Sequence, residues 1–251
     1  MSSGYKFTER SELDTAVELW ISDQNAAIEN YGDINTWDVS AITNFSNLFK
    51  DDTTFNSDIS KWDVSNASVF NGMFENAKSF NQNIGSWDVS TGHNFHRMFY
   101  GANSFNKDLG SWDVSNGREF SYMFSNAGSF NQDLGDWDVS YGSAFHRMFQ
   151  DTIFDHDIRS WDVSNGQKFT AMFENASSFN QDLSFWNVSP TISLLMFEGA
   201  DFMIGNGWSD NQKNEAFLGQ TKTGDANSEK IRGAGGNDIL SGLGGNDRLI
   251  G

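Results

Sequence analysis

The sequence contains no cysteine, only one proline and few basic residues. Without cysteine, neither a disulfide framework nor a thiolate site is available. No apolar run reaches the length of a transmembrane helix, and the residues up to Lys6 lack the apolar core of a secretory signal peptide. The formal net charge is −18, whereas phosphate binding needs a basic surface. We therefore expect no nucleic-acid partner and no direct membrane insertion.

A repeat dominates what is present. The tetrapeptide Trp-Asp-Val-Ser, changed to Trp-Asn-Val-Ser in its last copy, begins at Trp37, Trp62, Trp87, Trp112, Trp137, Trp161 and Trp186. Successive copies are about 25 residues apart, and a fixed period of this length is typical of a solenoid. We count coils one to seven from these tryptophans and number positions within each coil from its tryptophan.

Two periodicities lie inside each coil. Apolar and polar residues alternate around the tryptophan, as at Trp62 and Val64, which predicts a short strand with one buried face. From position nine onward, apolar residues recur at i, i+3, i+4 and i+7, which predicts a helix with one apolar stripe. The residues of this stripe in coil three are Phe95, Met98, Phe99 and Ala102.

The predicted fold class is an α/β solenoid. We expect a right-handed, leucine-rich-repeat-like coil with a parallel β-sheet on one face and short helices on the other. Residues 1–36 are predicted to form a helical N-terminal cap, with a helix over roughly 12–21 and a capping box of Ser11 and Asp14. Residues 37–202 form about seven coils, 203–222 a C-terminal cap and linker, and 223–251 a region of nine-residue repeats.

The repeat resembles a known family. The elements W-D-V-S-N, M-F and S-F-N-Q-D-L, complete between Trp161 and Leu183, are similar to the BspA-like leucine-rich-repeat surface proteins of bacteria. The resemblance implies a secreted or cell-surface protein that acts in adhesion and protein binding and is no enzyme. The chain departs from that pattern at position six, where an apolar residue is usual. Glycine stands there instead, which predicts a tighter turn or the close approach of a ligand; these glycines are Gly92, Gly117, Gly142 and Gly166.

The last stretch resembles a second family. Residues 233–241 and 242–250 are similar to the nonapeptides of repeats-in-toxin (RTX) proteins, which form a parallel β-roll around Ca²⁺. The resemblance implies sites shared between turns, with Asn227 and Glu229 paired with Gly245 and Asp247. A glycine-rich flexible linker is the alternative. The expected metal-site residues are Asn227, Glu229, Gly233, Gly236, Asp238, Gly242, Gly245 and Asp247. A chain that stops within such repeats is expected to be a segment of a larger RTX adhesin.

Three outward surfaces are candidates for binding. The first is the row of Asp and Ser at positions two and four, which predicts a hydrogen-bond ladder or, alternatively, an ion or polar ligand site. The second is the outer face of the predicted helices, and the third is the loop that begins each helix. The alternative for the helix face is an ordinary solvated surface, and the alternative for the loops is sequence variation without a functional constraint. The candidate ligand-binding residues are His93, His96, Arg97, Arg118, Tyr122, Tyr141, His146 and Arg147.

Enzymatic chemistry has little support. Four histidines are too few for a convincing zinc or acid-base site, and the aspartates lie in rows, although a glycosidase-like pair stays a minor alternative. We predict a secreted or cell-surface bacterial module, monomeric within a larger chain, whose coils bind protein or glycan on another cell. A structural spacer without a ligand is the main alternative. Ice binding is weaker, because charged Asp stands where Thr ladders would be expected.

Overall fold

The computed structural model describes residues 4–181 together with 183, 186, 188, 196–197, 222–223, 230–232, 240–241 and 248–250. In this part of the chain two helices, α1 (Arg10–Ser22) and α2 (Gln24–Tyr31), precede the 3-10 turn η1 (Ile34–Thr36). Four short strands follow much later: β1 (Lys222–Thr223), β2 (Lys230–Arg232), β3 (Leu240–Ser241) and β4 (Arg248–Ile250). None of the described helices is long and apolar enough to span a membrane.

The amino-terminal helices cover the first coil. Helix α1 includes the helix expected over 12–21 and buries Leu13, Ala16, Val17 and Trp20. The predicted capping box is wrong. The N-cap residue is Glu9, which makes no side-chain cap bond, and Asp14 instead accepts a hydrogen bond from Arg10 Nε at 2.9 Å.

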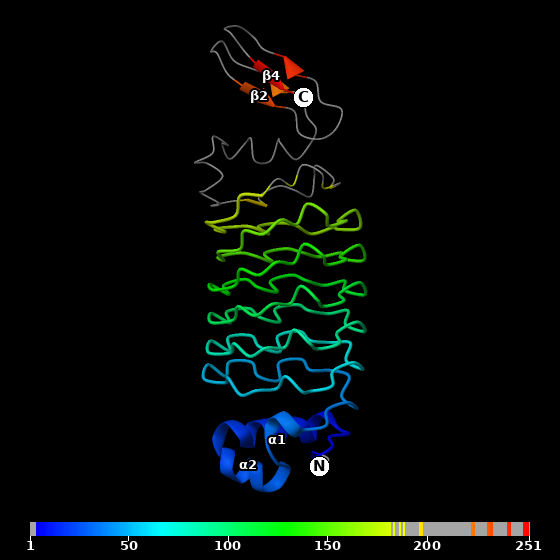
Figure 1. Ribbon diagram of the computed structural model, residues 1–251, viewed down its shortest axis with the longest axis vertical. Helices are drawn as coiled ribbons and strands as arrows, with labels where there is room; N and C mark the ends of the chain where they lie inside the picture. The colour runs from blue at the N-terminus through cyan, green and yellow to red at the C-terminus, as the bar shows by residue number, and fades with distance from the viewer. Residues whose placement is uncertain are drawn as a thin grey trace.

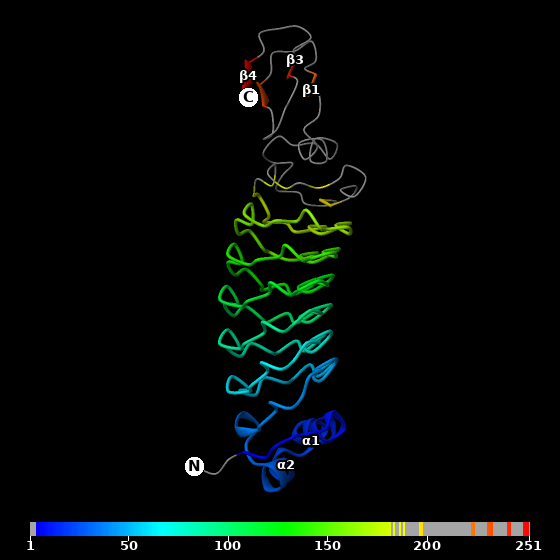
Figure 2. The ribbon, with the colours of Figure 1, turned by 90° about the vertical axis from the view of Figure 1, so that its right-hand side faces the viewer.

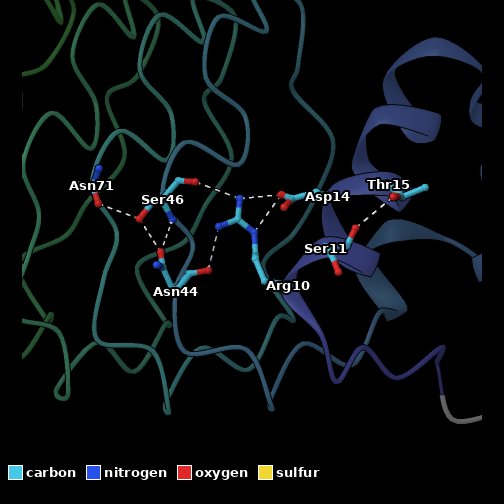
Figure 3. A network of polar contacts seen from close by, with 7 residues as sticks. All are labelled: Arg10, Ser11, Asp14, Thr15, Asn44, Ser46 and Asn71. Carbon is cyan, nitrogen blue, oxygen red and sulfur yellow. Dashed lines mark hydrogen bonds and ion pairs between the residues drawn. The ribbon is translucent and has the colours of Figure 1, made fainter.

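Arg10 fastens α1 to coil one (Figure 3). Its Nη1 donates to the Asn44 carbonyl at 3.0 Å and its Nη2 to the Ser46 carbonyl at 2.9 Å, while Asp14 holds the same guanidinium. Ser46 Oγ continues the network to Asn71 Oδ1 in coil two at 2.7 Å. In later coils, backbone N–H groups of the preceding coil donate to the carbonyls at these two positions. Coil one has no coil before it, so Arg10 of the cap supplies these donors instead.

The coils lie stacked along the long axis of the molecule, beyond α1 and α2 (Figures 1 and 2). Single parallel bridges at position eight join each coil to the next. They link Asn44, Val69, Asn94, Glu119, Ala144 and Lys168 in that order. The backbone N–H groups of Phe95, Arg97 and Phe99 then donate to carbonyls of coil four at 2.9 to 3.1 Å.

The predicted fold class is wrong. Within the described residues the coils consist of turns and isolated bridges, with neither the continuous parallel sheet nor the short helices expected from the sequence. Around the tryptophan the backbone bonds are local i to i−3 turns: Trp87 N donates to the Ile84 carbonyl and Gly92 N to the Val89 carbonyl. This segment therefore has turns where we predicted a strand.

The predicted helix fails because two positions in each coil adopt left-handed backbone angles. Position eleven has φ near +60° in all six described coils, at Asn47, Gly72, Arg97, Tyr122, Arg147 and Ala171. Position fifteen does the same, for example at Asn76 and Asn126. A right-handed helix cannot contain such residues. The apolar spacing that resembles a helix comes from successive i to i−3 turns, such as Met98 N to the Phe95 carbonyl at 3.1 Å.

The core is a set of stacked aromatic rows. Phe99 and Phe124 lie with ring centroids 5.6 Å apart and an interplanar angle of 1°. From Trp62 onward, each indole N–H donates to the carbonyl three residues before the preceding repeat tryptophan: Trp112 Nε1 donates to Ile84 at 3.0 Å and Trp137 Nε1 to Leu109 at 2.9 Å. Because these indoles are buried, each bond satisfies a donor that water cannot reach.

The glycines at position six serve this packing. A Cβ on Gly117 would lie 2.2 Å from Cζ of Phe120 and 2.8 Å from the Val114 carbonyl oxygen. Gly142 is equally close to Phe145. The close approach predicted from the sequence is therefore made by the ring at position nine of the same coil.

The four strands pair in the nine-residue repeat region. Strand β1 is parallel to β3, with Lys222 opposite Leu240, and β2 is parallel to β4, with Lys230 opposite Arg248. Both pairs are thus offset by 18 residues, or two nonapeptides. They are two separate two-stranded pairs, so the described strands form no continuous sheet. The predicted C-terminal roll is part of the fold class that the structure corrects.

Candidate ligand-binding surface

Five of the predicted ligand-binding residues gather on one face of coils three to five. Positions ten, eleven and fourteen place them beside one another across neighbouring coils, and Tyr100 joins them. We call this group the cation–aromatic cluster; it consists of His96, Arg97, Tyr100, Tyr122, His146 and Arg147.

Tyr122 is the centre of the cluster. The guanidinium carbons of Arg97 and Arg147 lie 4.9 and 5.8 Å from its ring centroid, within the range of cation–π attraction. The rings of His96 and His146 meet it edge-on, at centroid distances of 5.8 and 4.6 Å. Side chains of the protein itself therefore contact Tyr122 from several sides.

Carboxylates neutralise the cations of the cluster. Arg97 Nη1 lies 3.5 Å from Glu75 Oε1, and Arg147 Nε lies 3.7 Å from Glu174 Oε2. Glu75, which is buried, also binds Lys50 Nζ at 3.2 Å. The sequence analysis missed both glutamates. Both stand at position fourteen, three residues after the position that carries Arg97 and Arg147, and this short spacing was the available signal.

Glu119 and His146 have shifted pKa values. Burial raises the pKa of Glu119, but the nearby His96 imidazole and hydrogen bonds from Ser121 outweigh it and lower this pKa to about 2. Ser121 N donates to Glu119 Oε1 at 2.9 Å, and His96 Nδ1 lies 3.8 Å from the same oxygen. Burial and the charge of Arg147 lower the pKa of His146. At neutral pH an ionised Glu119 thus lies next to the cluster, in which His146 is neutral.

The backbone of the cluster is held from both sides. Arg97, Tyr122 and Arg147 have φ angles of 54°, 59° and 54°, a region that costs roughly 1–2 kcal/mol for a residue with a side chain. Inter-coil bonds offset this cost: Arg97 N donates to the Ser121 carbonyl and Tyr122 N to the His146 carbonyl. Arg97 Nε is buried and has no hydrogen-bond partner in the described structure.

The other three predicted residues lie outside the cluster, at the loop edge of the coils. We call this region the edge strip: His93, Arg118, Tyr141 and Ser143. Arg118 N donates to the His93 carbonyl at 3.0 Å, and Ser143 N donates to the Arg118 carbonyl at 2.9 Å. The residues at position seven of coils three, four and five, His93, Arg118 and Ser143, therefore form one row. Tyr141 lies two residues before Ser143 in coil five.

The Asp and Ser row consists of local turns. Asp63 Oδ1 accepts from the Ser65 N–H at 3.1 Å and from its hydroxyl at 2.6 Å, and the Asp88 carboxylate binds Ser90 in the same way. Bonds to the Ser90 hydroxyl and N–H lower the pKa of Asp88. The structure thus supports the predicted hydrogen bonding between Asp and Ser. Each of these bonds lies within one coil, however, and does not run from one coil to the next.

The predicted Ca²⁺ ligands Asn227, Glu229, Gly233, Gly236, Asp238, Gly242, Gly245 and Asp247 all lie outside the described residues. Among the residues that are described, no group of three or more His, Asp or Glu is placed to hold a metal ion.

A family model covers most of the chain. It is described as "Mycoplasma protein of unknown function, DUF285" and matches residues 19–134 and 107–208. The chain belongs to this family. The match spans α2 and the coils. No curated protein and no solved structure matches the chain.

Proposed function

We propose that the chain is a ligand-binding, non-catalytic module of a secreted or cell-surface bacterial protein. Its coils would bind protein or glycan on another cell, as the resemblance to BspA-like surface proteins implies. The main support is a contrast within the coils. Position nine is phenylalanine in all six described coils, whereas position seven reads Thr43, Ser68, His93, Arg118, Ser143 and Gln167. Repeat scaffolds commonly bind through outer residues that vary over a constant core.

The test is a binding screen with the full chain against a glycan array and a panel of immobilised cell-surface and matrix proteins. We expect saturable binding to at least one ligand that is weakened when outer residues of coils three to five are replaced. Binding to none would contradict the proposal and favour a structural spacer. The spacer has its own support, since the cations of the cluster are neutralised within the molecule.

We further propose that the nine-residue repeats bind Ca²⁺, as the RTX resemblance implies. The support is the register of β2 with β4, which are offset by two nonapeptides. The same offset relates Asn227 to Gly245 and Glu229 to Asp247, the pairs expected to share an ion. Carbonyl and carboxylate oxygens are the ligands that Ca²⁺ prefers.

Chelation tests the calcium proposal. With EDTA we expect faster proteolysis of roughly the last thirty residues while tryptophan fluorescence of the coils stays unchanged, because the coils contain their own core. Re-addition of Ca²⁺, but not of Mg²⁺, should restore protection. Equal protease sensitivity with and without Ca²⁺ would contradict metal binding.

A further inference from the structure

The eight residues that sequence analysis selected divide into two physically different sets. In the cation–aromatic cluster, the Arg and His side chains contact acidic or aromatic side chains of the protein itself. In the edge strip, the side chains of His93, Arg118 and Tyr141 make no hydrogen bond, ion pair or ring contact with any described residue. A ligand can therefore engage the edge strip without breaking internal contacts, whereas it must displace partners in the cluster.

Tyr141 interrupts a hydrogen-bonded row at position five. Side chains at this position bind the Ser carbonyl of the preceding coil: Asn116 Nδ2 donates to Ser90 at 2.8 Å and Asn165 Nδ2 to Ser140 at 2.8 Å. Thr91 makes the equivalent bond to Ser65 at 2.9 Å. Tyr141 makes no such bond to a described residue, and it is 64% exposed. Coil five thus gives up a repeated stabilising contact and exposes an aromatic ring.

Arg118 lies one coil away from Tyr141 on the same edge. Its carbonyl accepts from both the N–H and the hydroxyl of Ser143, at 2.9 and 3.1 Å, so its backbone is fixed while its side chain stays exposed. In a chain of net charge −18, an exposed guanidinium without an internal acid is a local positive site. It is suited to bidentate binding of a carboxylate.

We propose that the edge strip binds an acidic segment of a partner protein, with Tyr141 inserted into an apolar contact and Arg118 paired with an Asp or Glu. This inference rests on the proposed ligand-binding function. Tyrosine and arginine are among the residue types enriched in the hot spots of protein interfaces. Small-molecule sites are concave and enclose most of the ligand. A ring as exposed as that of Tyr141 instead projects outward, which favours a protein partner over a small glycan.

The test pans a 12-residue random peptide display library against the full 251-residue chain and measures the affinity of the enriched peptides. We expect them to combine Asp or Glu with an apolar residue. Tyr141→Asn and Arg118→Gln should each weaken binding at least tenfold. Asparagine at 141 is expected to restore the bond of Asn116 and Asn165, so this variant should unfold at the same or a higher temperature than the original chain. Lys107→Gln, which removes a positive charge elsewhere on coil three, is the matched control and should bind normally.

Each other outcome overturns the proposal in a distinct way. Enriched peptides without acidic residues, or binding that depends on Arg147 in the cluster and not on Arg118, would show that the edge strip is not the site. Binding of a sialylated glycan through Tyr141, with no acidic peptide enriched, would replace the protein partner by a carbohydrate. If no peptide is enriched while the chain still binds a ligand of the panel, the inference fails and the proposed function stands. If nothing binds in any format, the proposed function itself fails.

Discussion

Positions nine and eleven, two residues apart in every coil, follow opposite rules. In coils one to six position nine is phenylalanine, and its side chain is fully buried in each of them. Position eleven carries asparagine, glycine, arginine, tyrosine, arginine and alanine in turn. The difference shows that the fold constrains the buried positions and not the outer ones. A buried ring touches the rings of the coils before and after it, so its identity must repeat, as Phe95 shows by stacking on both Phe70 and Phe120.

The outer residues can vary because the backbone holds them in place. Position eleven donates its N–H to the next coil whatever its side chain, as Arg97 and Tyr122 do. Even a left-handed φ, which disfavours arginine and tyrosine, is tolerated there. The interior thus fixes the stack, and the exterior is free to acquire contacts such as those of the cluster.

Removing one ring of the interior should have the largest effect. Trp112→Ala deletes a buried indole that packs against Phe95 and Phe99 and binds the Ile84 carbonyl. We expect a loss of about 3–5 kcal/mol in the free energy of unfolding, measured by urea denaturation. Trp112→Phe keeps most of the volume and loses the hydrogen bond, so it should cost less. An alanine variant as stable as the original chain would contradict the role of the tryptophan row.

Adding one carbon at position six should have a smaller effect. In Gly117→Ala the new Cβ would lie 2.2 Å from Phe120 Cζ, so the ring must shift within a packed core. Overpacking of this kind costs about 1–3 kcal/mol. Ala67 occupies the same position in coil two, so we expect the chain to fold around the substitution. Gly128→Ala is the control, because its Cβ would meet nothing within 4 Å. Equal unfolding midpoints for the two variants would contradict the packing argument.

Correcting an exception inside coil one should increase stability. Asp52 stands at position sixteen, where alanine occurs in four of the other described coils, and its Oδ2 is buried without a hydrogen-bond partner. Burial raises the pKa of Asp52, so its charged form is disfavoured in the folded chain. Asp52→Ala should stabilise the protein by about 1 kcal/mol at pH 7.

The pH dependence of this gain checks its cause. A raised carboxyl pKa lowers stability as the pH rises above the ordinary value of about 3.8, so the gain from Asp52→Ala should shrink below that pH. A gain that is equal at pH 3 and pH 7 would indicate that lost side-chain volume, and not the buried charge, is responsible.

The sequence predicts the repeat and its buried residues well, because a ring that recurs at a fixed interval can be read without knowing the backbone. Phe99, Met98 and Trp112 are buried as the pattern indicates. It fails for the backbone between them. The spacing of Phe95, Met98, Phe99 and Ala102 is equally compatible with a helix and with successive turns. What decides between them is the left-handed angle at Arg97 and Gly101, where each backbone N–H donates to a carbonyl of the next coil.

The candidate site shows the same limit. Alignment of the coils correctly placed His96, Arg97, Tyr122, His146 and Arg147 together, because residues at the same or adjacent positions stack. It placed Tyr141 at the loop edge, but it did not separate them from His93 and Arg118. That separation depends on partners such as Glu75 and Glu174, which reach the cluster from the coil on either side of it. Pairing between coils is not visible in the pattern of any single one.

The smallest expected effect concerns protonation in the cluster. His146 is partly buried beside Arg147, and its surroundings also include Glu119, Lys168 and His96. Because its pKa is lowered in the folded chain, the unfolded chain binds more protons once the pH falls below the ordinary histidine value of about 6.5. Stability should therefore decline as the pH falls from about 6.5 to 5. Glu119, with a pKa of about 2, contributes only below its ordinary value of about 4.5, so the two groups are separated by pH.

His146→Ser, which introduces the residue found in coils one and four, should remove the decline in stability between pH 6.5 and 5 and leave the decline below pH 4.5 in place. Parallel curves for the two proteins, measured as urea midpoints at half-unit intervals, would show that His146 is not the group that titrates.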